Sequence, residues 1–388
     1  MSTPDSTSPD STTPGSTAPD SDTPDNGSPQ GPDSGPGPVV PLRVGLVGYG
    51  PAGSFFHAPL ITSTPGLALD TIVTGDQQRR QQARAEYPDV RFAAGADELW
   101  DRAGELDLIV LASPNRTHVP LATAALAAGL PVVVDKPLAG TAAEARELAR
   151  LAATHDRLLT VFQNRRWDAD FLTLQALIRQ GALGDVQRFE SRFERWRPQP
   201  KGGWRESGDP AEFGGLLYDL GSHLVDQALT LFGPAQRVYA EAAVRRPGAA
   251  ADDDSFIALT HAGGVRSHLW MSATTARLGP RFRVLGSAAG YVTYGLDPQE
   301  PALRAGLRPG GGAAWGVEPE SAWGTLGTGD DVRPVPSLPG NYPAFYAAVE
   351  TALRDGTEPP VTALEAAAAL DVIEAARTSA RTGKTVEL

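Results

Sequence analysis

The chain has 388 residues, a formal net charge of −12 and no Cys, so it is long enough for two domains with sizeable cores. The lack of Cys excludes disulfides, thiolate catalysis and Cys-ligated zinc, and it fits a reducing cytoplasm. The acidic balance disfavours a nucleic-acid partner, and no apolar run reaches the ~18 residues of a membrane span.

Residues 1–40 consist largely of Ser, Thr, Pro, Asp and Gly, and Pro recurs every five residues from Pro4 to Pro29. Because such a segment cannot build an apolar core, we predict a disordered, solubilising tail without a specific function. It also lacks the basic and apolar regions of a signal peptide, so we expect a cytoplasmic protein.

The folded region is predicted to begin with an apolar strand at 42–47 that runs into the motif G-x-G-x-x-G. Gly48 allows a tight turn, Gly50 lets phosphates approach the backbone, and Gly53 lets a following helix at 51–60 pack against the strand. Free N–H groups and the positive end of the helix dipole then meet at one point, which suits a pyrophosphate. We interpret the motif as a dinucleotide site rather than a plain Gly-rich turn. The residues predicted to line it are Gly48, Tyr49, Gly50, Pro51, Ala52 and Gly53.

From residue 67 onward, predicted strands alternate with predicted helices. The strands are expected at 67–73, 90–93, 106–112, 131–134 and 158–162. The helices are expected at 77–86, 119–128 and 141–155, and the last begins with a capping box of Thr141 and Glu144. This alternation is typical of α/β proteins with a parallel, doubly wound sheet, so we assign residues 41–162 to a Rossmann dinucleotide-binding domain.

After about residue 163 the pattern changes to strands of alternating polarity. These strands are expected at 186–196, 236–244, 255–261, 265–271, 281–285 and 291–294. The Gly- and Pro-rich residues 298–340 are expected to form loops, and helices are predicted at 342–353 and 363–381. We assign residues 163–388 to an α+β substrate and oligomerisation domain with a mostly antiparallel open sheet. Because an uncovered sheet face is a liability, we expect it to be buried in a homo-oligomer.

Asp135, Lys136 and Pro137 follow directly after the strand at 131–134. Ligands of open α/β sheets bind outside the carboxyl ends of the strands, so Lys136 is expected at the mouth of the cofactor crevice. A Lys there can donate to a substrate hydroxyl, and desolvation can lower its pKa. The alternative is a solvated surface Lys.

Asp219 and His223 are four residues apart and would share one face of a helix whose other faces are rich in Leu. A polar pair that faces inward from an apolar helix suits a His general base beside a hydroxyl. The alternative is a His that is hydrogen-bonded within the core. No third ligand lies nearby in the sequence, so we expect no metal site.

The segment that leaves the first predicted domain carries Asn164, Arg165 and Asp168. Such crossings often line interdomain clefts, so we predict that these residues contact the substrate. A purely structural ion pair is the open alternative. The Trp- and Arg-rich residues 195–205 are a candidate cover for the cleft.

The end of the second predicted strand bears on the choice of nicotinamide cofactor. NAD-selective sites usually place an acid there, about 20 residues after the glycines. Here the strand ends in Thr74 and Gly75, and Arg79 and Arg80 follow, so these side chains could bind a 2′-phosphate. We predict NADP(H) rather than NAD(H), and the opposing interpretation makes Asp76 the ribose-binding acid.

Taken together, these motifs resemble the glucose–fructose oxidoreductase / inositol dehydrogenase family, Gfo/Idh/MocA, and within it the bacterial scyllo-inositol dehydrogenases. The likeness is carried by residues 48–60, 113–118, 161–168, 218–223 and 294–300. The family's E-K-P motif corresponds to Asp135-Lys136-Pro137 in this chain. The resemblance implies a Rossmann domain before an open-sheet domain, assembled as a dimer or tetramer. It also implies further cofactor contacts at Gly75, Asp76, Arg79, Ser113, Pro114, Asn115, His118, Asp135 and Lys136.

The resemblance further implies an oxidoreductase that transfers a hydride between NAD(P) and a secondary alcohol of a polyol or sugar. We expect His223 to take the hydroxyl proton, Lys136 to hydrogen-bond the oxygen, and Asp219 to hold the substrate or orient the cleft. Which of His223 and Lys136 is the base stays open. Two alternative functions are a cofactor-sensing regulatory protein and a redox-assisted glycoside hydrolase. A cofactor-sensing regulatory protein has no need for these three residues together, and a redox-assisted glycoside hydrolase regenerates its nicotinamide in every turnover.

Overall fold

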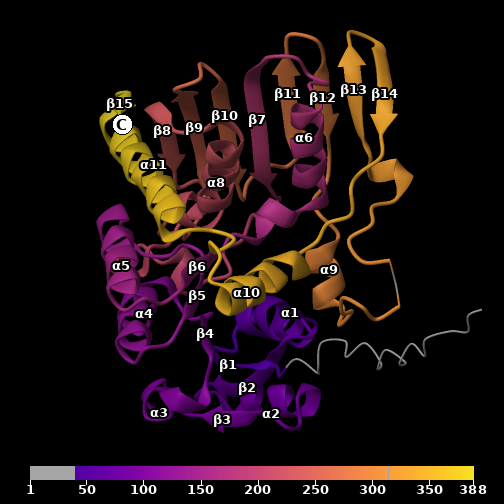
Figure 1. The fold of residues 1–388 in the computed structure, drawn as a ribbon. Helices are drawn as coiled ribbons and strands as arrows, with labels where there is room; N and C mark the ends of the chain where they lie inside the picture. Colours follow the sequence, from indigo (N-terminus) through magenta and orange to yellow (C-terminus); the bar gives the residue numbers. More distant parts are fainter. Residues whose placement is uncertain (1–39, 313) are drawn as a thin grey trace, which may run out of the picture. The chain divides into compact units, whose positions relative to one another are not determined.

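The computed structural model describes residues 40–312 and 314–388, so the predicted tail lies, except for Val40, outside the described residues. Two β-sheets organise the described part of the chain (Figure 1). Residues 40–388 form one compact unit, and the predicted division into domains after residue 162 stays a prediction. Within the described ranges, no helix is both long and apolar enough to cross a membrane.

The first sheet has six parallel strands in the order β3-β2-β1-β4-β5-β6, which confirms the predicted doubly wound architecture. The strands are β1 (Leu42–Val47), β2 (Leu67–Val73), β3 (Arg91–Ala93), β4 (Leu108–Leu111), β5 (Val132–Asp135) and β6 (Leu159–Phe162). Every residue of β4, β5 and β6 is buried, which explains why these strands are almost continuously apolar.

Helical segments connect these strands. They are η1 (Gly53–His57), α1 (Ala58–Thr62), α2 (Gln77–Glu86), α3 (Asp97–Trp100), η2 (Ala103–Glu105), η3 (Asn115–Thr117), α4 (His118–Ala127) and α5 (Ala142–Thr154). The predicted capping box of α5 is confirmed, because the Glu144 amide donates to Thr141 Oγ1 at 3.2 Å and the Thr141 amide donates to Glu144 Oε2 at 3.0 Å. Residues 51–62 are helical throughout, but η1 is a π-helix where a regular helix was predicted. Such segments are rare and occur frequently at functional sites.

The second sheet has nine strands in the order β14-β13-β12-β11-β7-β10-β9-β8-β15. The strands are β7 (Val186–Glu194), β8 (Ala235–Ala243), β9 (Asp254–His261), β10 (Arg266–Ser272), β11 (Phe282–Gly286), β12 (Gly290–Thr293), β13 (Gly324–Thr328), β14 (Asp331–Val335) and β15 (Val386–Glu387). β7 and β10 pair in parallel, whereas the other neighbours in the described sheet are antiparallel. The prediction of a mostly antiparallel sheet is therefore confirmed.

The prediction that residues 298–340 form only loops is wrong. This stretch contains α9 (Gln299–Arg304), η7 (Glu320–Ala322) and a hairpin of β13 and β14 that extends one edge of the second sheet. β13 was not predicted because of its glycine content. Its Gly324 packs so closely against Tyr291 that a Cβ would lie 2.5 Å from the Tyr291 hydroxyl. Pro334 lies in β14, the outermost strand, where its missing N–H is tolerated.

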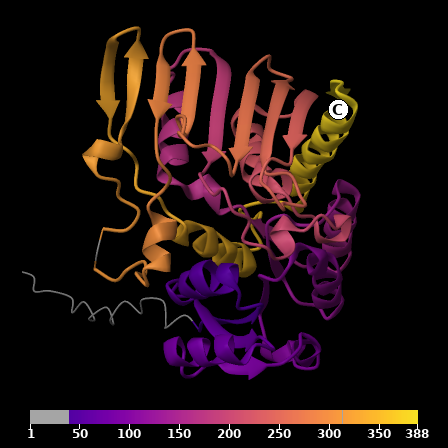
Figure 2. The ribbon, with the colours of Figure 1, turned by 180° about the vertical axis from the view of Figure 1, so that it is seen from behind.

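Helices cover one face of the second sheet. They are α6 (Ala169–Arg179), which the sequence pattern did not predict, α8 (Gly221–Phe232) and α11 (Ala363–Thr382). Seen from behind, the strands of the described sheet have no helix in front of them (Figure 2). On this uncovered face the half-buried rings of Phe256 and Trp270 lie 5.1 Å apart, and the Arg192 guanidinium stacks 4.0 Å from the Trp270 ring.

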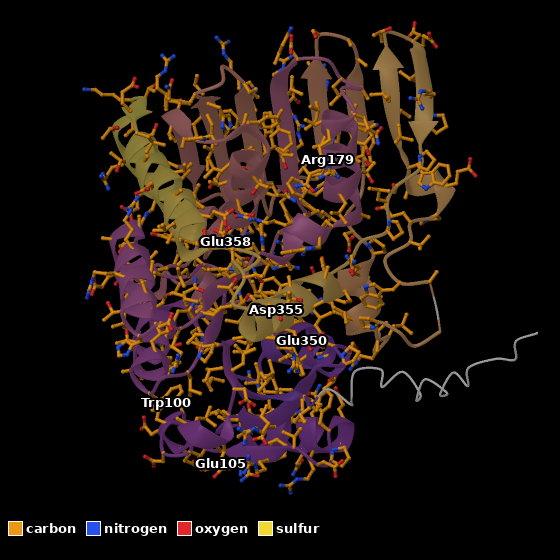
Figure 3. The ribbon with its side chains drawn as sticks, viewed as in Figure 1. Trp100, Glu105, Arg179, Glu350, Asp355 and Glu358 are labelled. Atoms are coloured by element: carbon orange, nitrogen blue, oxygen red, sulfur yellow. The ribbon has the colours of Figure 1, made fainter. Side chains whose placement is uncertain are left out.

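Direct contacts join the two sheets within the described unit. β6 continues into η4 (Asn164–Trp167) and α6, and α10 (Pro343–Asp355) packs against α1. Thr160 Oγ1 donates to the Val361 carbonyl at 2.7 Å, next to the start of α11. Exposed charged side chains lie both away from this junction, such as Glu105 and Arg179, and beside it, such as Asp355 at the end of α10 (Figure 3).

Candidate active site

The glycine turn after β1 has the geometry that a bound dinucleotide requires. Gly48 has φ +99°, and a Cβ there would lie 2.5 Å from the Ala112 carbonyl oxygen. A Cβ at Gly53 would overlap the carbonyl oxygen of Gly48, so these two positions need glycine for the fold itself. A Cβ at Gly50 would meet only Arg79 Nη1, at 3.9 Å. The turn is therefore open at Gly50, where a pyrophosphate can approach the backbone, and these residues fit a dinucleotide.

Residues 113–118 lie beside this turn, because β4 is the neighbour of β1. The Ser113 amide nitrogen would be 3.2 Å from a Cβ at Gly48, and Asn115 Nδ2 donates to the Phe213 carbonyl at 3.2 Å. Tyr49 is only 1% exposed and its hydroxyl has no partner among the described residues, and its predicted contact with the cofactor stays a prediction. The predicted contact of Pro114 with the cofactor stays a prediction.

His118 is fully buried and ties together two loops of the site. Its ring nitrogens lie 2.7 Å from the Pro137 carbonyl and 3.0 Å from the Ser113 carbonyl. Burial lowers the pKa of His118, although both carbonyls and Asp135 oppose this shift. A neutral ring donates to one carbonyl at a time, so we expect His118 to position the loops around the cofactor.

The end of β2 carries the residues predicted to select the cofactor. Asp76 caps α2, since its Oδ1 accepts from the amides of Gln78 and Arg79 at 2.9 and 3.1 Å. Arg79 Nε lies 3.5 Å from Asp76 Oδ2, while Arg79 Nη1 reaches toward Gly50. Thr74 is buried, and its carbonyl accepts from Arg80 Nη2 at 3.3 Å. The Asp76 carboxylate is therefore already bound to the helix and to an arginine.

Lys136 and Asp219 meet as an ion pair beyond the carboxyl end of β5. Lys136 Nζ donates to Asp219 Oδ1 at 3.0 Å and to the Asp219 carbonyl oxygen at 2.6 Å. The Lys136 side chain is 12% exposed. Burial raises the pKa of Asp219, but the charges of Lys136, Arg205 and Arg195 outweigh this effect and lower it to about 2. Asp219 is therefore an anion at all ordinary pH values and fixes the position of the Lys136 ammonium.

The expectation that Asp219 and His223 share one continuous helix is wrong. Asp219 ends α7 (Leu216–Asp219) and His223 lies in α8, with Leu220 between the helices. The His223 amide donates to the Leu220 carbonyl at 3.2 Å instead of to Asp219. The break leaves the Asp219 carbonyl free to accept from Lys136 Nζ, so the interruption itself builds the site.

His223 is 6% exposed and stacks on Phe193 with ring centroids 6.4 Å apart. Its Nδ1 has no hydrogen-bond partner among the described residues. Burial lowers the pKa of His223 well below its usual value, and the charges of Lys136, Arg165 and Arg281 add to this effect. His223 is therefore neutral near pH 7 and able to accept a proton.

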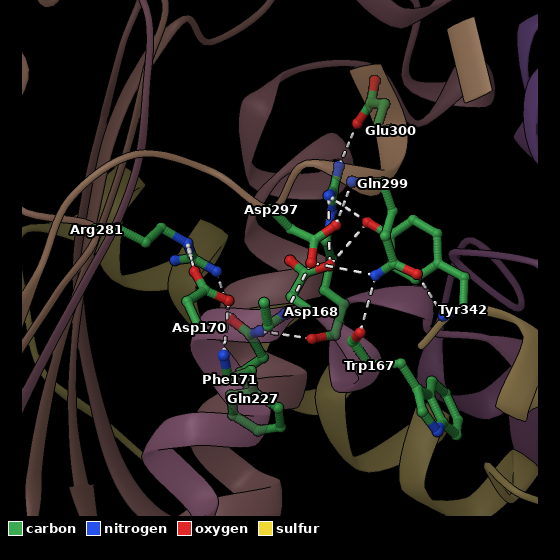
Figure 4. A network of polar contacts seen from close by, with 12 residues as sticks. Trp167, Asp168, Asp170, Phe171, Gln227, Arg281, Asp297, Gln299, Glu300 and Tyr342 are labelled. Carbon is green, nitrogen blue, oxygen red and sulfur yellow. Dashed lines mark hydrogen bonds and ion pairs between the residues drawn. The ribbon is translucent and has the colours of Figure 1, made fainter. Parts of the chain in front are cut away.

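Arg165 and Asp168 of the crossing segment belong to a buried polar network, in which Asp168 is labelled in Figure 4. Arg165 Nη1 donates to the Tyr342 hydroxyl at 2.8 Å, and Arg165 Nη2 donates to Glu300 Oε2 at 2.5 Å. The same Tyr342 hydroxyl donates to Asp168 Oδ1 at 2.7 Å, and Asp168 is 1% exposed. Asn164 is also buried. We therefore expect Asp168 to position Arg165 and Tyr342, whereas Arg165 can reach the space beside Phe193, 5.3 Å from its ring.

His57, Arg205 and Arg281 of this region were not predicted as site residues, whereas Asp135 was predicted as a cofactor contact. Asp135 Oδ1 lies 3.9 Å from His57 Nε2, and His57 Nδ1 contacts the Tyr346 hydroxyl at 2.6 Å, so the Asp135 carboxylate faces the protein interior. Arg205 Nε lies 3.5 Å from Asp219 Oδ1, within the segment predicted to cover the cleft. Arg281 lies directly before β11, and the local sequence pattern there indicated only a strand.

Comparisons with known proteins agree with this geometry. A family model described as "Oxidoreductase family, NAD-binding Rossmann fold" matches residues 42–163, and one described as "GFO/IDH/MocA C-terminal domain" matches residues 171–292. With the fold and the glycine turn, these matches define an oxidoreductase with an NAD(P)-binding Rossmann fold. The chain belongs to the Gfo/Idh/MocA family.

Individual relatives span nearly the whole described chain. The chain is 44% identical over 342 residues to the uncharacterized oxidoreductase YdgJ of Escherichia coli, covering 88% of this chain and 96% of YdgJ. It is 34% identical over 351 residues to the scyllo-inositol 2-dehydrogenase (NADP(+)) IolW of Bacillus subtilis, covering 89% and 96%. Its fold is similar to that of yvaA from Bacillus subtilis, with a TM-score of 0.84, 33% identity and coverage of 90% and 99%.

Proposed function

We propose that this oxidoreductase transfers a hydride between NADP(H) and a secondary alcohol of a polyol or sugar of inositol-like character. The observation that carries the proposal is the buried group of Lys136, Asp219 and His223 beyond the carboxyl end of β5. Lys136 is held in place by Asp219, and His223 is a neutral ring. IolW, a relative at 34% identity, is named as a scyllo-inositol 2-dehydrogenase that uses NADP(+), which supports the same substrate class.

His223, Lys136 and Asp219 have separate roles in the proposed proton transfer. The nicotinamide, when bound, accepts or supplies the hydride. His223 accepts the proton of the reacting hydroxyl, since burial keeps its ring neutral. Lys136 donates to the same oxygen and stabilises the negative charge that develops on it. Asp219 holds Lys136 through its carboxylate and its carbonyl.

A substrate screen tests the proposal directly. The purified full chain is mixed with NADP⁺ and each of a set of inositols, sugars and alditols and their carboxylate and phosphate derivatives, and the absorbance of the reduced cofactor is followed. Reduction with at least one of them is expected. Products without net change in NADPH would instead support the redox-assisted glycoside hydrolase, and cofactor binding without any turnover would support the cofactor-sensing protein.

The cofactor preference gives a first prediction. Arg79 reaches toward Gly50, and Asp76 is occupied by the cap of α2, so we expect kcat/KM to be higher with NADP⁺ than with NAD⁺. Arg79→Ala should reduce the preference by about 10- to 100-fold, because a hydrogen bond to a charged group contributes ~1.5–3 kcal/mol. Arg84→Ala, an exposed arginine on the same helix, is the matched control. A higher kcat/KM with NAD⁺ would contradict the prediction, and Asp76→Ser should then relax that preference.

The uncovered face of the second sheet gives a second prediction. Phe256 and Trp270 are only half-buried there, so we expect a second copy of the chain to cover them in a dimer or tetramer. Light scattering at micromolar concentration should give at least twice the chain mass of 40.7 kDa. Trp270→Glu should shift the mass toward that of one chain without weakening cofactor binding. A wild-type monomer would refute the prediction.

A further inference from the structure

The space beside Asp219 and His223 is bordered by an excess of positive charge. Lys136 Nζ and Arg205 Nε lie 3.0 and 3.5 Å from the same Asp219 oxygen. Arg165 pairs with Glu300 at 2.5 Å and with Asp168 at 3.5 Å. This excess of positive charge is local, because the chain as a whole carries a net charge of −12.

Arg195 adds a cation that has no carboxylate partner. It follows β7 directly, and its backbone is fixed, since its amide donates to the Ser272 carbonyl at 2.9 Å and its carbonyl accepts from the Thr275 amide at 3.2 Å. Its guanidinium lies 5.7 Å from the centroid of the Phe193 ring, on which His223 stacks. Among the residues that the structure describes, no acid lies within 4.0 Å of the Arg195 guanidinium, and its side chain forms no hydrogen bond.

Three guanidiniums thus surround the Phe193 ring. Those of Arg165, Arg195 and Arg281 lie 5.3, 5.7 and 5.6 Å from its centroid. Arg281 is balanced by Asp170 at 3.1 Å. Burial lowers the pKa of Arg195, and Asp219 opposes this shift only in part while Arg197 and Arg165 reinforce it. Because Arg195 is only half-buried and has no acid within 4.0 Å among the described residues, its guanidinium is available to pair with a bound anion.

We propose that the substrate of this site is an acidic sugar or polyol, whose carboxylate or phosphate is held by Arg195 while its reacting hydroxyl faces His223 and Lys136. The proposal rests on the function proposed above and narrows its substrate class. A guanidinium binds either anion through paired hydrogen bonds, so Arg195 is suited to both. Arg165 and Arg205 lie close enough to add attraction, but each already has a carboxylate partner.

Ligand binding tests this without relying on turnover. D-gluconate and D-glucitol have the same carbon chain and differ in one carboxylate, and D-glucose 6-phosphate and D-glucose form the phosphate pair. Each is titrated into the full chain with saturating NADP⁺, and tryptophan fluorescence is followed, since Trp204 packs 4.2 Å from the Arg205 guanidinium. We expect the acidic member of one pair to bind at least about tenfold more tightly than its neutral partner, since tenfold corresponds to about 1.4 kcal/mol.

The variants connect this preference to Arg195. Arg195→Gln should abolish the preference and leave binding of the neutral partner within about twofold, while Arg195→Lys should retain part of it. Arg237→Gln removes the same charge from an exposed position on β8, three strands from β7, and should change nothing. Whichever pair shows the preference identifies the anion as carboxylate or phosphate.

The outcomes separate this proposal from the general function. Equal binding within both pairs by the wild-type chain would overturn it, and that comparison needs no variant to fold. A preference that persists in Arg195→Gln would also overturn it. If acids bind through Arg195 but no alcohol reduces NADP⁺, the anion site stands and the dehydrogenase function is refuted.

Discussion

Lys136→Ala and His223→Ala are each expected to lower kcat by about 10²- to 10⁴-fold, the usual effect of losing a group that transfers or stabilises a proton. Cofactor affinity should remain within a few-fold of wild type, because Lys136 and His223 lie apart from the glycine turn, where we propose that the pyrophosphate binds. Steady-state kinetics and a cofactor titration measure the two quantities separately.

Two matched variants serve as controls for these losses. Lys384→Ala removes an exposed lysine, and His155→Ala removes the half-buried histidine at the end of α5. Both should keep near-normal turnover. If Lys136→Ala or His223→Ala also kept near-normal turnover, the residue in question would be structural rather than catalytic.

The pH dependence distinguishes the two catalytic roles. His223 acts as a base only when neutral, and its pKa lies well below 6.5, so kcat/KM for oxidation should stay constant from neutral pH to below 6.5. It should then fall as the pH drops through the His223 pKa. Asp219, with a pKa of about 2, does not titrate in this range. His223→Ala should therefore remove the acid limb, and a limb that persisted would assign it to another group.

The glycine turn gives the second large expected effect. Gly53→Ala should lower the melting temperature, because its Cβ would overlap the Gly48 carbonyl oxygen and the turn would have to open. Overpacking of this kind costs ~1–3 kcal/mol. Gly50→Ala should leave the melting temperature unchanged, since its Cβ would meet only Arg79 Nη1.

Cofactor titrations complete this comparison. Gly50→Ala should raise the Kd for NADP⁺ by about 10- to 100-fold, because the new methyl group would occupy the approach of the pyrophosphate. Calorimetry for stability and fluorescence for binding separate the two variants. Unchanged NADP⁺ affinity in Gly50→Ala would show that the pyrophosphate does not bind at this turn.

Local sequence patterns determined much of the fold. β2 and α2 have their predicted bounds, because the patterns that indicate a strand or a helix are formed by residues close together in the sequence. The capping box of α5 is equally local. The hairpin of β13 and β14 was missed, because its glycines and its proline are explained only by packing against Tyr291 and by the position at the sheet edge.

The candidate site was only partly determined by the sequence. Residue type and position pointed to Lys136, Asp219 and His223, since acid–base residues beside apolar segments can be recognised in the sequence alone. The break at Leu220, which frees the Asp219 carbonyl for Lys136, depends on a contact between residues 83 positions apart. Likewise, the sequence shows that Arg165, Arg195 and Arg281 exist, but only the tertiary structure brings their guanidiniums around one phenylalanine ring. Pairings between distant segments leave no periodic signal, so the charge of the site was decided by the fold.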